Sequence, residues 1–174
     1  TNKHLIPVAN KPLIEYGIEA LKNSGITDIG IIVGHTDERV QEIKSVLGDG
    51  SKYGVKFTYI FQDAPRGLAH AVKVAQNFLT DNNPDRKFVV HLGDNIIKGG
   101  IQDFVSHFKN SQHDVLVLFR NVPDPQRFGV AEFENGKLLR VIEKPREPPP
   151  NFALVGVYFF PAAIFPSIDK LKPS

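Results

Sequence analysis

Short apolar runs alternate with amphipathic stretches over the first two thirds of the chain. The runs are rich in valine, isoleucine and phenylalanine, as buried strands are, and they lie at residues 29–33, 55–61, 88–92 and 115–119. Apolar residues recur at helical spacing between and before these runs, at residues 12–24, 36–47, 67–79 and 101–109. Thr36 is expected to cap the second of these helices. Strands that alternate with helices predict an α/β fold, with a largely parallel sheet covered on both faces.

The pattern changes after residue 120. Predicted strands at 128–133 and 138–142 flank Asn135-Gly136, a dipeptide typical of tight hairpins. An apolar strand at 153–160 and a short helix that begins at Pro161 complete the prediction. Residues 1–11 show no clean period, and the proline run 148–150 indicates a stiff connector.

Composition narrows the class of protein. The 174 residues fit one domain, and 41% hydrophobic with 23% charged residues is ordinary for a globular protein. The net charge is only +2, without a basic block interleaved with aromatics, so nucleic acid is not an expected partner. No apolar run is long enough to span a membrane and no signal peptide pattern is seen, so we expect a cytoplasmic protein. The absence of cysteine excludes disulfides and thiolate metal sites, and the absence of methionine suggests that Thr1 is not the native start.

The sequence Gly93-Asp94-Asn95 follows the apolar run 88–92 directly. Asp94 is therefore expected at the carboxyl end of a central strand, where open α/β sheets bind ligands. A carboxylate at that place suits Mg²⁺ and a phosphate-bearing substrate. The alternative for a single Gly-Asp pair is an aspartate that caps a turn.

Four segments together indicate a family. They are Lys3 with 7–12, 62–71, 92–95, and 127–130 with 143–145. The run 127–130 lies within Asp-Pro-Gln-Arg-Phe-Gly-Val-Ala-Glu at 124–132, and 143–145 is Glu-Lys-Pro. Ala-Leu-Val-Gly-Val-Tyr follows at 153–158. In this order they resemble the sugar-1-phosphate nucleotidyltransferases, and most closely the glucose-1-phosphate thymidylyltransferases of the long type, over essentially the whole chain. The resemblance implies a Rossmann-like three-layer sandwich with a mixed, mostly parallel sheet that lacks its first central strand. Residues 1–174 would then form one partial nucleotidyltransferase domain.

The resemblance also implies a reaction. Glucose 1-phosphate attacks the α-phosphorus of dTTP, or of UTP, and pyrophosphate leaves, with Mg²⁺ as cofactor and dTTP preferred. Such chemistry asks for positioning and charge neutralisation rather than for a nucleophile on the protein. The implied partners are the nucleoside triphosphate and the sugar 1-phosphate, and homo-oligomerisation is left open.

By the same resemblance, individual residues acquire roles. The catalytic positions are Lys3, Asp94 and Lys144, with Asp94 as the metal ligand. The nucleotide-binding positions are Gln62, Gly67 and Leu68. The sugar-phosphate-binding positions are Phe128, Gly129, Glu143, Lys144, Val155, Gly156 and Tyr158. Simpler interpretations are a solvated Lys3, a helix start at Gly67, and a surface ion pair between Glu143 and Lys144.

Two family features are absent from these residues. One is a glycine-rich Gly-x-Gly-Thr-Arg loop, which in the family precedes the segment that begins here and binds the triphosphate through backbone amides. The other is a later stretch that leads to a second metal-binding aspartate. We therefore expect little catalysis by the 174 residues alone, and a gap, or a strand supplied from elsewhere, between the strands at 29–33 and 88–92. The alternatives are a non-catalytic sugar-nucleotide-sensing or regulatory homologue, and a glycosyltransferase. The last usually needs Asp-x-Asp, whereas Asn95 and Ile96 follow Asp94.

Overall fold

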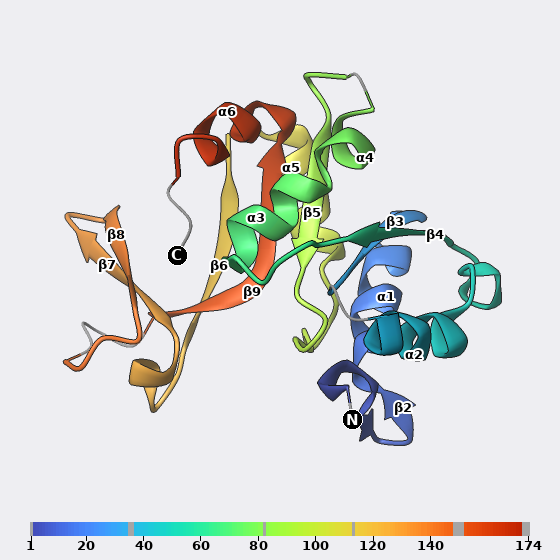
Figure 1. The fold of residues 1–174 in the computed structure, drawn as a ribbon. Helices are drawn as coiled ribbons and strands as arrows, with labels where there is room; N and C mark the ends of the chain where they lie inside the picture. Colours follow the sequence, from blue (N-terminus) through green and yellow to red (C-terminus); the bar gives the residue numbers. More distant parts are fainter. Residues whose placement is uncertain (1, 35–36, 82, 113, 148–151, 172–174) are drawn as a thin grey trace.

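The computed structural model describes residues 2–34, 37–81, 83–112, 114–147 and 152–171 (Figure 1). Its α-helices are α1 Leu13–Asn23, α2 Asp37–Leu47, α3 Gly67–Val74, α4 Gln76–Thr80, α5 Gln102–Asn110 and α6 Phe165–Ile168. Its strands are β1 Pro7–Val8, β2 Lys11–Pro12, β3 Asp28–Val33, β4 Lys56–Phe61, β5 Lys87–His91, β6 Leu116–Asn121, β7 Gly129–Glu134, β8 Lys137–Glu143 and β9 Phe152–Pro161. Short 3₁₀ turns are η1 Lys3–Leu5, η2 Ser51–Tyr53, η3 Pro125–Arg127 and η4 Ala162–Ile164.

The predicted strands and helices are present, with local differences. The helix predicted at 67–79 is interrupted at Ala75 and forms α3 and α4. The segment without a clean period forms η1 and a small hairpin of β1 and β2, whose turn residues Ala9 and Asn10 have positive φ. At the predicted β7–β8 turn, Asn135 and Gly136 both have positive φ, as a tight hairpin requires. Thr36 and the proline run lie outside the described residues.

Strand pairing is parallel in one sheet and antiparallel in the others, which agrees with the α/β class, but the expectation of mostly parallel pairing was wrong. β3 and β4 pair in parallel, whereas β5, β9, β7 and β8 form an antiparallel sheet in that order. β6 also pairs with β9, so the long strand β9 runs antiparallel between β5 and β6. Hydrogen-bonded parallel pairing is therefore limited to β3 and β4 among the described strands, because the chain returns through β9 between two strands that share a direction.

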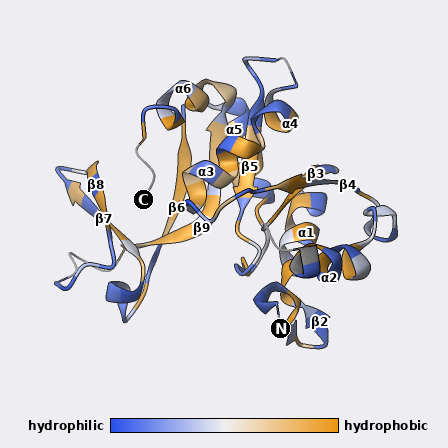
Figure 2. Cartoon of the chain, in the orientation of Figure 1, coloured by the Kyte–Doolittle hydropathy of each residue, from blue (hydrophilic) through white to orange (hydrophobic). Residues whose placement is uncertain are grey.

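Helices cover both faces of the larger sheet, as a three-layer arrangement requires. Val89 and Phe159 face a cluster that includes residues of α1, α2 and α5. Their neighbours Phe88 and Phe160 face α3 and α6, where Phe165 stacks on Phe88 at 5.8 Å between ring centroids. Figure 2 shows the hydrophobic residues concentrated on β5, β6 and β9, in the middle of the molecule. Within the described segments, no helix is long and apolar enough to cross a membrane.

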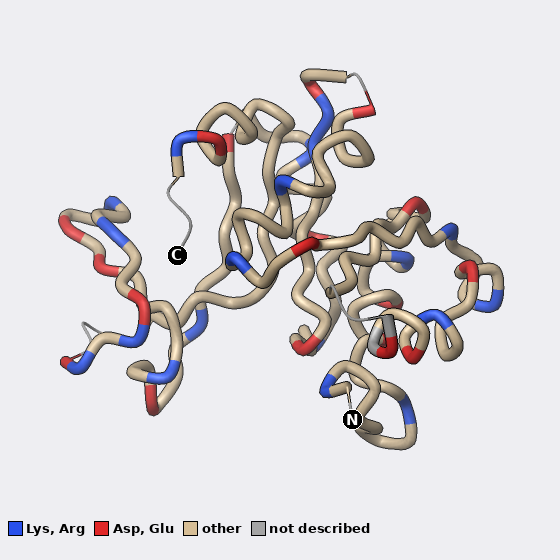
Figure 3. Tube along the Cα trace, in the orientation of Figure 1, with Lys and Arg blue, Asp and Glu red and all other residues tan. Residues whose placement is uncertain are grey.

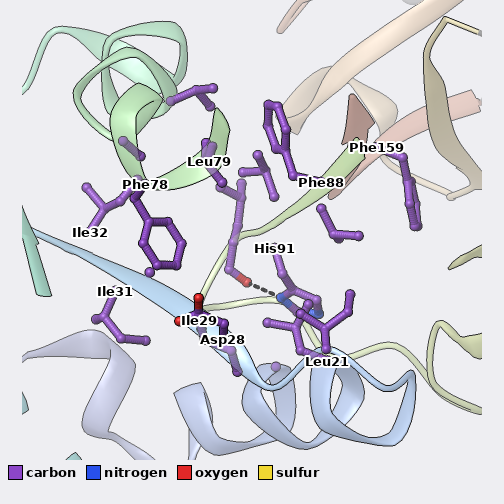
Figure 4. Close-up of a pocket in the computed structure, with 18 of the residues that line it drawn as sticks. Leu21, Asp28, Ile29, Ile31, Ile32, Phe78, Leu79, Phe88, His91 and Phe159 are labelled. Atoms are coloured by element: carbon purple, nitrogen blue, oxygen red, sulfur yellow. Dashed lines mark hydrogen bonds between the residues drawn. The ribbon is translucent and has the colours of Figure 1, made fainter. Parts of the chain in front are cut away.

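The predicted gap between the strands at 29–33 and 88–92 is present. Ile31 of β3 pairs with Tyr59 of β4, and Val90 of β5 pairs with Tyr158 of β9. No hydrogen bond joins β3 to β5 among the described residues, and a cavity of about 870 Å³ lies between them. Figure 4 shows Ile29 and Ile31 from β3, Phe88 from β5, and Phe78 and Leu79 from α4 around this space. We call it the β3–β5 slot.

Candidate functional site

Asp94 lies just beyond the carboxyl end of β5, as predicted. A tight turn places it there, because the Asn95 amide donates to the Leu92 carbonyl at 3.1 Å. The Asn95 side chain fixes this turn: its Nδ2 donates to Asp94 Oδ1 and its Oδ1 accepts from the Gly156 amide, each at 3.1 Å. A Cβ at Gly156 would lie 2.5 Å from Asn95 Nδ2 and 2.8 Å from a Leu92 methyl carbon. A larger residue at this point of β9 would therefore displace the Asn95 and Leu92 side chains.

Lys3 is the cation that meets Asp94. Its Nζ donates to Asp94 Oδ2 at 2.7 Å, with side chains 65% and 34% exposed. This hydrogen bond lowers the pKa of Asp94, so the carboxylate is ionised at neutral pH. Because the pair is open to solvent, it contributes only about 0–1 kcal/mol to stability. His4 packs beside Gly93, and its burial lowers the pKa of the imidazole.

Asp94 is compatible with one kind of metal site. Mg²⁺ in phosphoryl-transfer sites is usually held by one or two carboxylates, substrate phosphates and water, rather than by a cage of side chains. Within the described residues, no group of three or more His, Asp or Glu side chains could hold a metal ion alone. Asp94 is an ionised, partly exposed carboxylate at a strand end, and it suits a Mg²⁺ ion that is held mainly by substrate phosphates and water. Lys3 occupies part of the space around the carboxylate where a metal ion would bind.

The predicted nucleotide-binding residues lie where β4 passes into α3. Gln62 follows β4, and its backbone N–H donates to the Val33 carbonyl at 2.9 Å. Its side-chain Nε2 lies 3.5 Å from the Gly67 carbonyl and 3.1 Å from His70 Nδ1. Gly67 opens α3 with a φ of +84°, a conformation that side chains rarely adopt. Gly67 is the first residue of α3, and its part in nucleotide binding stays a prediction. The side chain of Leu68 packs on the α3–α6 cluster.

The predicted sugar-phosphate residues gather at the base of the β7–β8 hairpin. Gly129 pairs with Glu143, and the Lys144 amide donates to the Phe128 carbonyl at 3.0 Å. Lys144 has a φ of +43°, which is uncommon for a residue with a side chain and recurs at functional sites. Its Nζ lies 3.8 Å from Glu143 Oε1, with both side chains largely exposed. The Lys144 ammonium is thus open to an anionic ligand.

β9 lies beside both Asp94 and the residues at the base of the β7–β8 hairpin. Gly156 contacts Asn95, while a Cβ at Gly129 would contact Leu154. The pKa of Tyr158 is raised, mainly by burial and also by the charge of Glu143. The Val155 side chain instead packs against the core cluster that includes Phe108 of α5. The convergence of Asp94, Gly129, Glu143 and Lys144 on one cleft stays a prediction, because no contact among the described residues joins the two groups directly.

The distribution of charged residues and the extent of the β3–β5 slot are the remaining features of this region. Figure 3 shows acidic and basic residues interspersed along the chain. The β3–β5 slot is apolar along most of its length and reaches Gln62, Leu68 and Gly93. The open space therefore extends from the gap in the sheet to the predicted nucleotide-binding residues.

Two residues of this region were missed by sequence reasoning. Asn95 links Asp94 to β9, and His70 contacts the Gln62 side chain. Asn95 stands inside the Gly-Asp-Asn motif, so its position could have suggested it. His70 could have been suggested by its position one turn into a helix that begins beside Gln62.

Comparisons with known proteins bear on the family and the fold of the chain. Residues 1–174 match the profile of a family described as Nucleotidyl transferase. A low-salt glycan biosynthesis nucleotidyltransferase of Haloferax volcanii is 47% identical over 99% of this chain and 47% of its own length. A glucose-1-phosphate thymidylyltransferase of Streptomyces antibioticus is 46% identical, with the same coverage. The chain thus spans about half the length of these curated relatives.

A solved structure has the same fold. It comes from Bacillus anthracis, is assigned as a glucose-1-phosphate thymidylyltransferase, and contains a sucrose. It superposes with a TM-score of 0.90 at 41% identity, covering 100% of this chain and 68% of the other. The Rossmann-like nucleotidyltransferase fold is thereby confirmed.

Proposed function

Because the chain belongs to the nucleotidyl transferase family, we propose that the protein carrying it transfers the nucleotidyl group of dTTP, or of UTP, to glucose 1-phosphate. The products are a nucleotide sugar and pyrophosphate. Relatives named glucose-1-phosphate thymidylyltransferase support this choice of substrates and favour dTTP. The observation that supports the proposal best concerns the strand β9. Asn95, which holds Asp94, accepts from its Gly156 amide, and Gly129, which pairs with Glu143, lies against its Leu154.

In this proposal, cationic residues bind phosphate groups, and Glu143 and the uncharged residues bind the sugar and the base. Lys144 binds the sugar phosphate, and Glu143 accepts hydrogen bonds from sugar hydroxyls, because a carboxylate only accepts. Gly129, Phe128 and the backbone of β9 around Val155 and Gly156 shape the sugar pocket, with Tyr158 beside Glu143. Gln62 and Gly67 read the nucleobase, and Leu68 supports them from the core. The attack on the α-phosphorus then needs charge neutralisation, which Lys3 supplies.

Mg²⁺ is the cofactor we propose, held by Asp94. When bound, it neutralises charge on the phosphate oxygens. Lys3 exchanges its contact with Asp94 for one with the triphosphate, since both are anionic and the pair is open to solvent. We place the reaction in the cytoplasm, and leave the oligomeric state to measurement.

The test is an assay on the protein at the length of its curated relatives, with dTTP or UTP and several sugar 1-phosphates. We expect product with glucose 1-phosphate and a preference for dTTP. A strong preference for N-acetylglucosamine 1-phosphate with UTP would overturn the substrate assignment. Binding of a nucleotide sugar without turnover would instead support the non-catalytic homologue.

A further inference from the structure

Three side chains lie in a row at the start of α3, joined by one hydrogen bond and one close contact with a carboxylate. Gln62 Nε2 lies 3.1 Å from His70 Nδ1, and His70 Nε2 lies 3.2 Å from Asp63 Oδ1. The His70 side chain is 20% exposed, and Asp63 is held from its other oxygen by Arg66 at 3.8 Å. We call this row the Asp63–His70–Gln62 relay.

The partners assign the donor and acceptor in each contact. The Asp63 carboxylate can only accept, so the hydrogen of a neutral imidazole lies on Nε2 and Nδ1 is an acceptor. The Gly67 carbonyl also only accepts, and it lies 3.5 Å from the same Gln62 nitrogen. Both neighbours therefore place the amide NH₂ of Gln62 toward the protein. No hydrogen bond to Gln62 Oε1 is found among the described residues, so this oxygen is the atom left for a ligand.

We propose that His70 is a positioning residue that turns the Gln62 carbonyl oxygen toward the nucleobase, and so selects bases that present an N–H donor. This inference rests on the proposed function, in which Gln62 reads the base. Thymine and uracil present N3–H, whereas cytosine presents an unprotonated N3 beside a 4-amino group. An outward-facing Gln62 oxygen accepts a hydrogen bond from N3–H of thymine or uracil. The same oxygen is repelled by the N3 lone pair of cytosine. Without His70, the amide can turn over and both orientations become available.

The sharpest readout is the ratio of kcat/KM for UTP to kcat/KM for CTP, because the two nucleotides differ only at this base edge. The assay uses the protein at the length of its relatives, at a pH above the ordinary titration range of histidine. We expect His70→Leu to lower this ratio about tenfold, the size of one hydrogen bond, and His70→Gln to restore most of it through its acceptor oxygen. His107→Leu, on the distant helix α5, is the matched control and should leave the ratio unchanged.

A second variant tests the relay through its other end. Asp63→Leu removes the carboxylate that favours a hydrogen on His70 Nε2, so the Nδ1–H tautomer and the reversed Gln62 amide become available. The ratio should fall toward that of His70→Leu. The imidazole NMR signals of His70 report the tautomer without substrate: we expect the Nε2–H form in the unsubstituted protein and a mixture with the Nδ1–H form in Asp63→Leu.

The outcomes distinguish a failure of the role proposed for His70 from a failure of the proposed nucleotidyl transfer. An unchanged ratio in His70→Leu, or an Nδ1–H tautomer in the unsubstituted protein, overturns the inference while turnover with UTP still supports the function. A general loss of folding would lower kcat/KM for both nucleotides together, so an unchanged ratio among the molecules that still turn over also counts against it. If the unsubstituted protein turns over no nucleotide, the proposed function fails and base selection by Gln62 fails with it.

Discussion

The charges of Asp94 and Lys144 are held in different ways. Asp94 is tied down on both oxygens, by Lys3 and by Asn95, and its lowered pKa keeps it ionised for a cation. Among the described residues, the Lys144 ammonium has only a 3.8 Å contact with Glu143, and the Lys144 backbone is left-handed. A cation held in an unusual conformation and left open to solvent is poorly explained by stability, and suits capture of an anion.

Lys144→Ala, in the protein at the length of its relatives, should raise the KM for glucose 1-phosphate and lower kcat/KM by about 10- to 100-fold. The reason is the loss of a charge-assisted hydrogen bond of about 1.5–3 kcal/mol. Steady-state kinetics with dTTP saturating will measure it. Lys137→Ala, at the far end of the same hairpin, is the control and should leave both constants near their original values. Equal kinetics for the two variants would refute the role of Lys144.

Asp94→Asn should abolish most of the Mg²⁺-dependent turnover, by about 100-fold or more, because the amide keeps the shape but not the negative charge. A Mg²⁺ titration of the rate will show whether the variant saturates at higher metal concentration. Asp103→Asn, an exposed aspartate of α5, serves as the matched control. Ordinary turnover of Asp94→Asn at low Mg²⁺ would contradict the assignment of Asp94 as the metal ligand.

At the scale of elements, β9 organises the site. It pairs with β5 and β6, touches β7, and provides Gly156 as the partner of Asn95. Its position between β5 and β6 could not be predicted from its apolar pattern, because strand order depends on contacts far apart in sequence. Hydrophobic period did predict which residues form β3, β5 and β6, since burial alone fixes that choice. The break at Ala75 was not predicted, because the helical apolar period continues through it.

In the site, too, features with a local sequence signal could be predicted, and features that depend on distant contacts could not. Asp94 and the Asn135-Gly136 turn could be predicted because a local signal marks each: a strand end followed by glycine, and a dipeptide that tolerates positive φ. The contacts of Asn95 with Gly156 and of His70 with Asp63 could not, because they depend on side-chain placement in the folded chain. The roles of Gln62 and Glu143 came from family resemblance, which supplies what spacing does not.

Gly156→Ala should damage the site through β9. The added Cβ would lie 2.8 Å from Asn95 Cγ, so Asn95 and then Asp94 must move. We expect a loss of about 1–3 kcal/mol in the free energy of unfolding and about a tenfold lower kcat. Gly34→Ala is the control, since apart from its chain neighbours no atom of the described residues lies within 4 Å of its added Cβ. Urea unfolding and kcat for both variants decide it, and identical behaviour would show that the Asn95–Gly156 contact does not position Asp94.

At the scale of the whole molecule, the β3–β5 slot is the main irregularity. β3 and β5 each have one edge without a strand partner in the described structure, and such edges invite pairing. His91 borders the slot, and its Nε2 is buried without a hydrogen-bond partner among the described residues. A buried polar atom, two open edges and an apolar cavity together suit one more extended strand.

The 174 residues alone should therefore be less stable than a chain that also supplies a strand for the slot. Hydrogen exchange of the β3 and β5 amides that face the slot measures this directly. We expect rapid exchange in the 174-residue chain and strong protection in the protein at the length of its relatives, while the β3–β4 amides serve as an internal reference. Equal protection of the slot-facing amides in both chains would show that the short chain closes its own sheet.

The central claim is that the protein moves a nucleotidyl group to a sugar phosphate, and the fate of labelled phosphorus tests it most directly. The protein at the length of its relatives is incubated with glucose 1-phosphate, Mg²⁺ and dTTP labelled in either the α- or the γ-phosphate. Attack at the α-phosphorus predicts that the α-label enters a dTDP-sugar and that the γ-label leaves as pyrophosphate. Release of the γ-label as orthophosphate, or no transfer of the α-label to the sugar, would contradict the account.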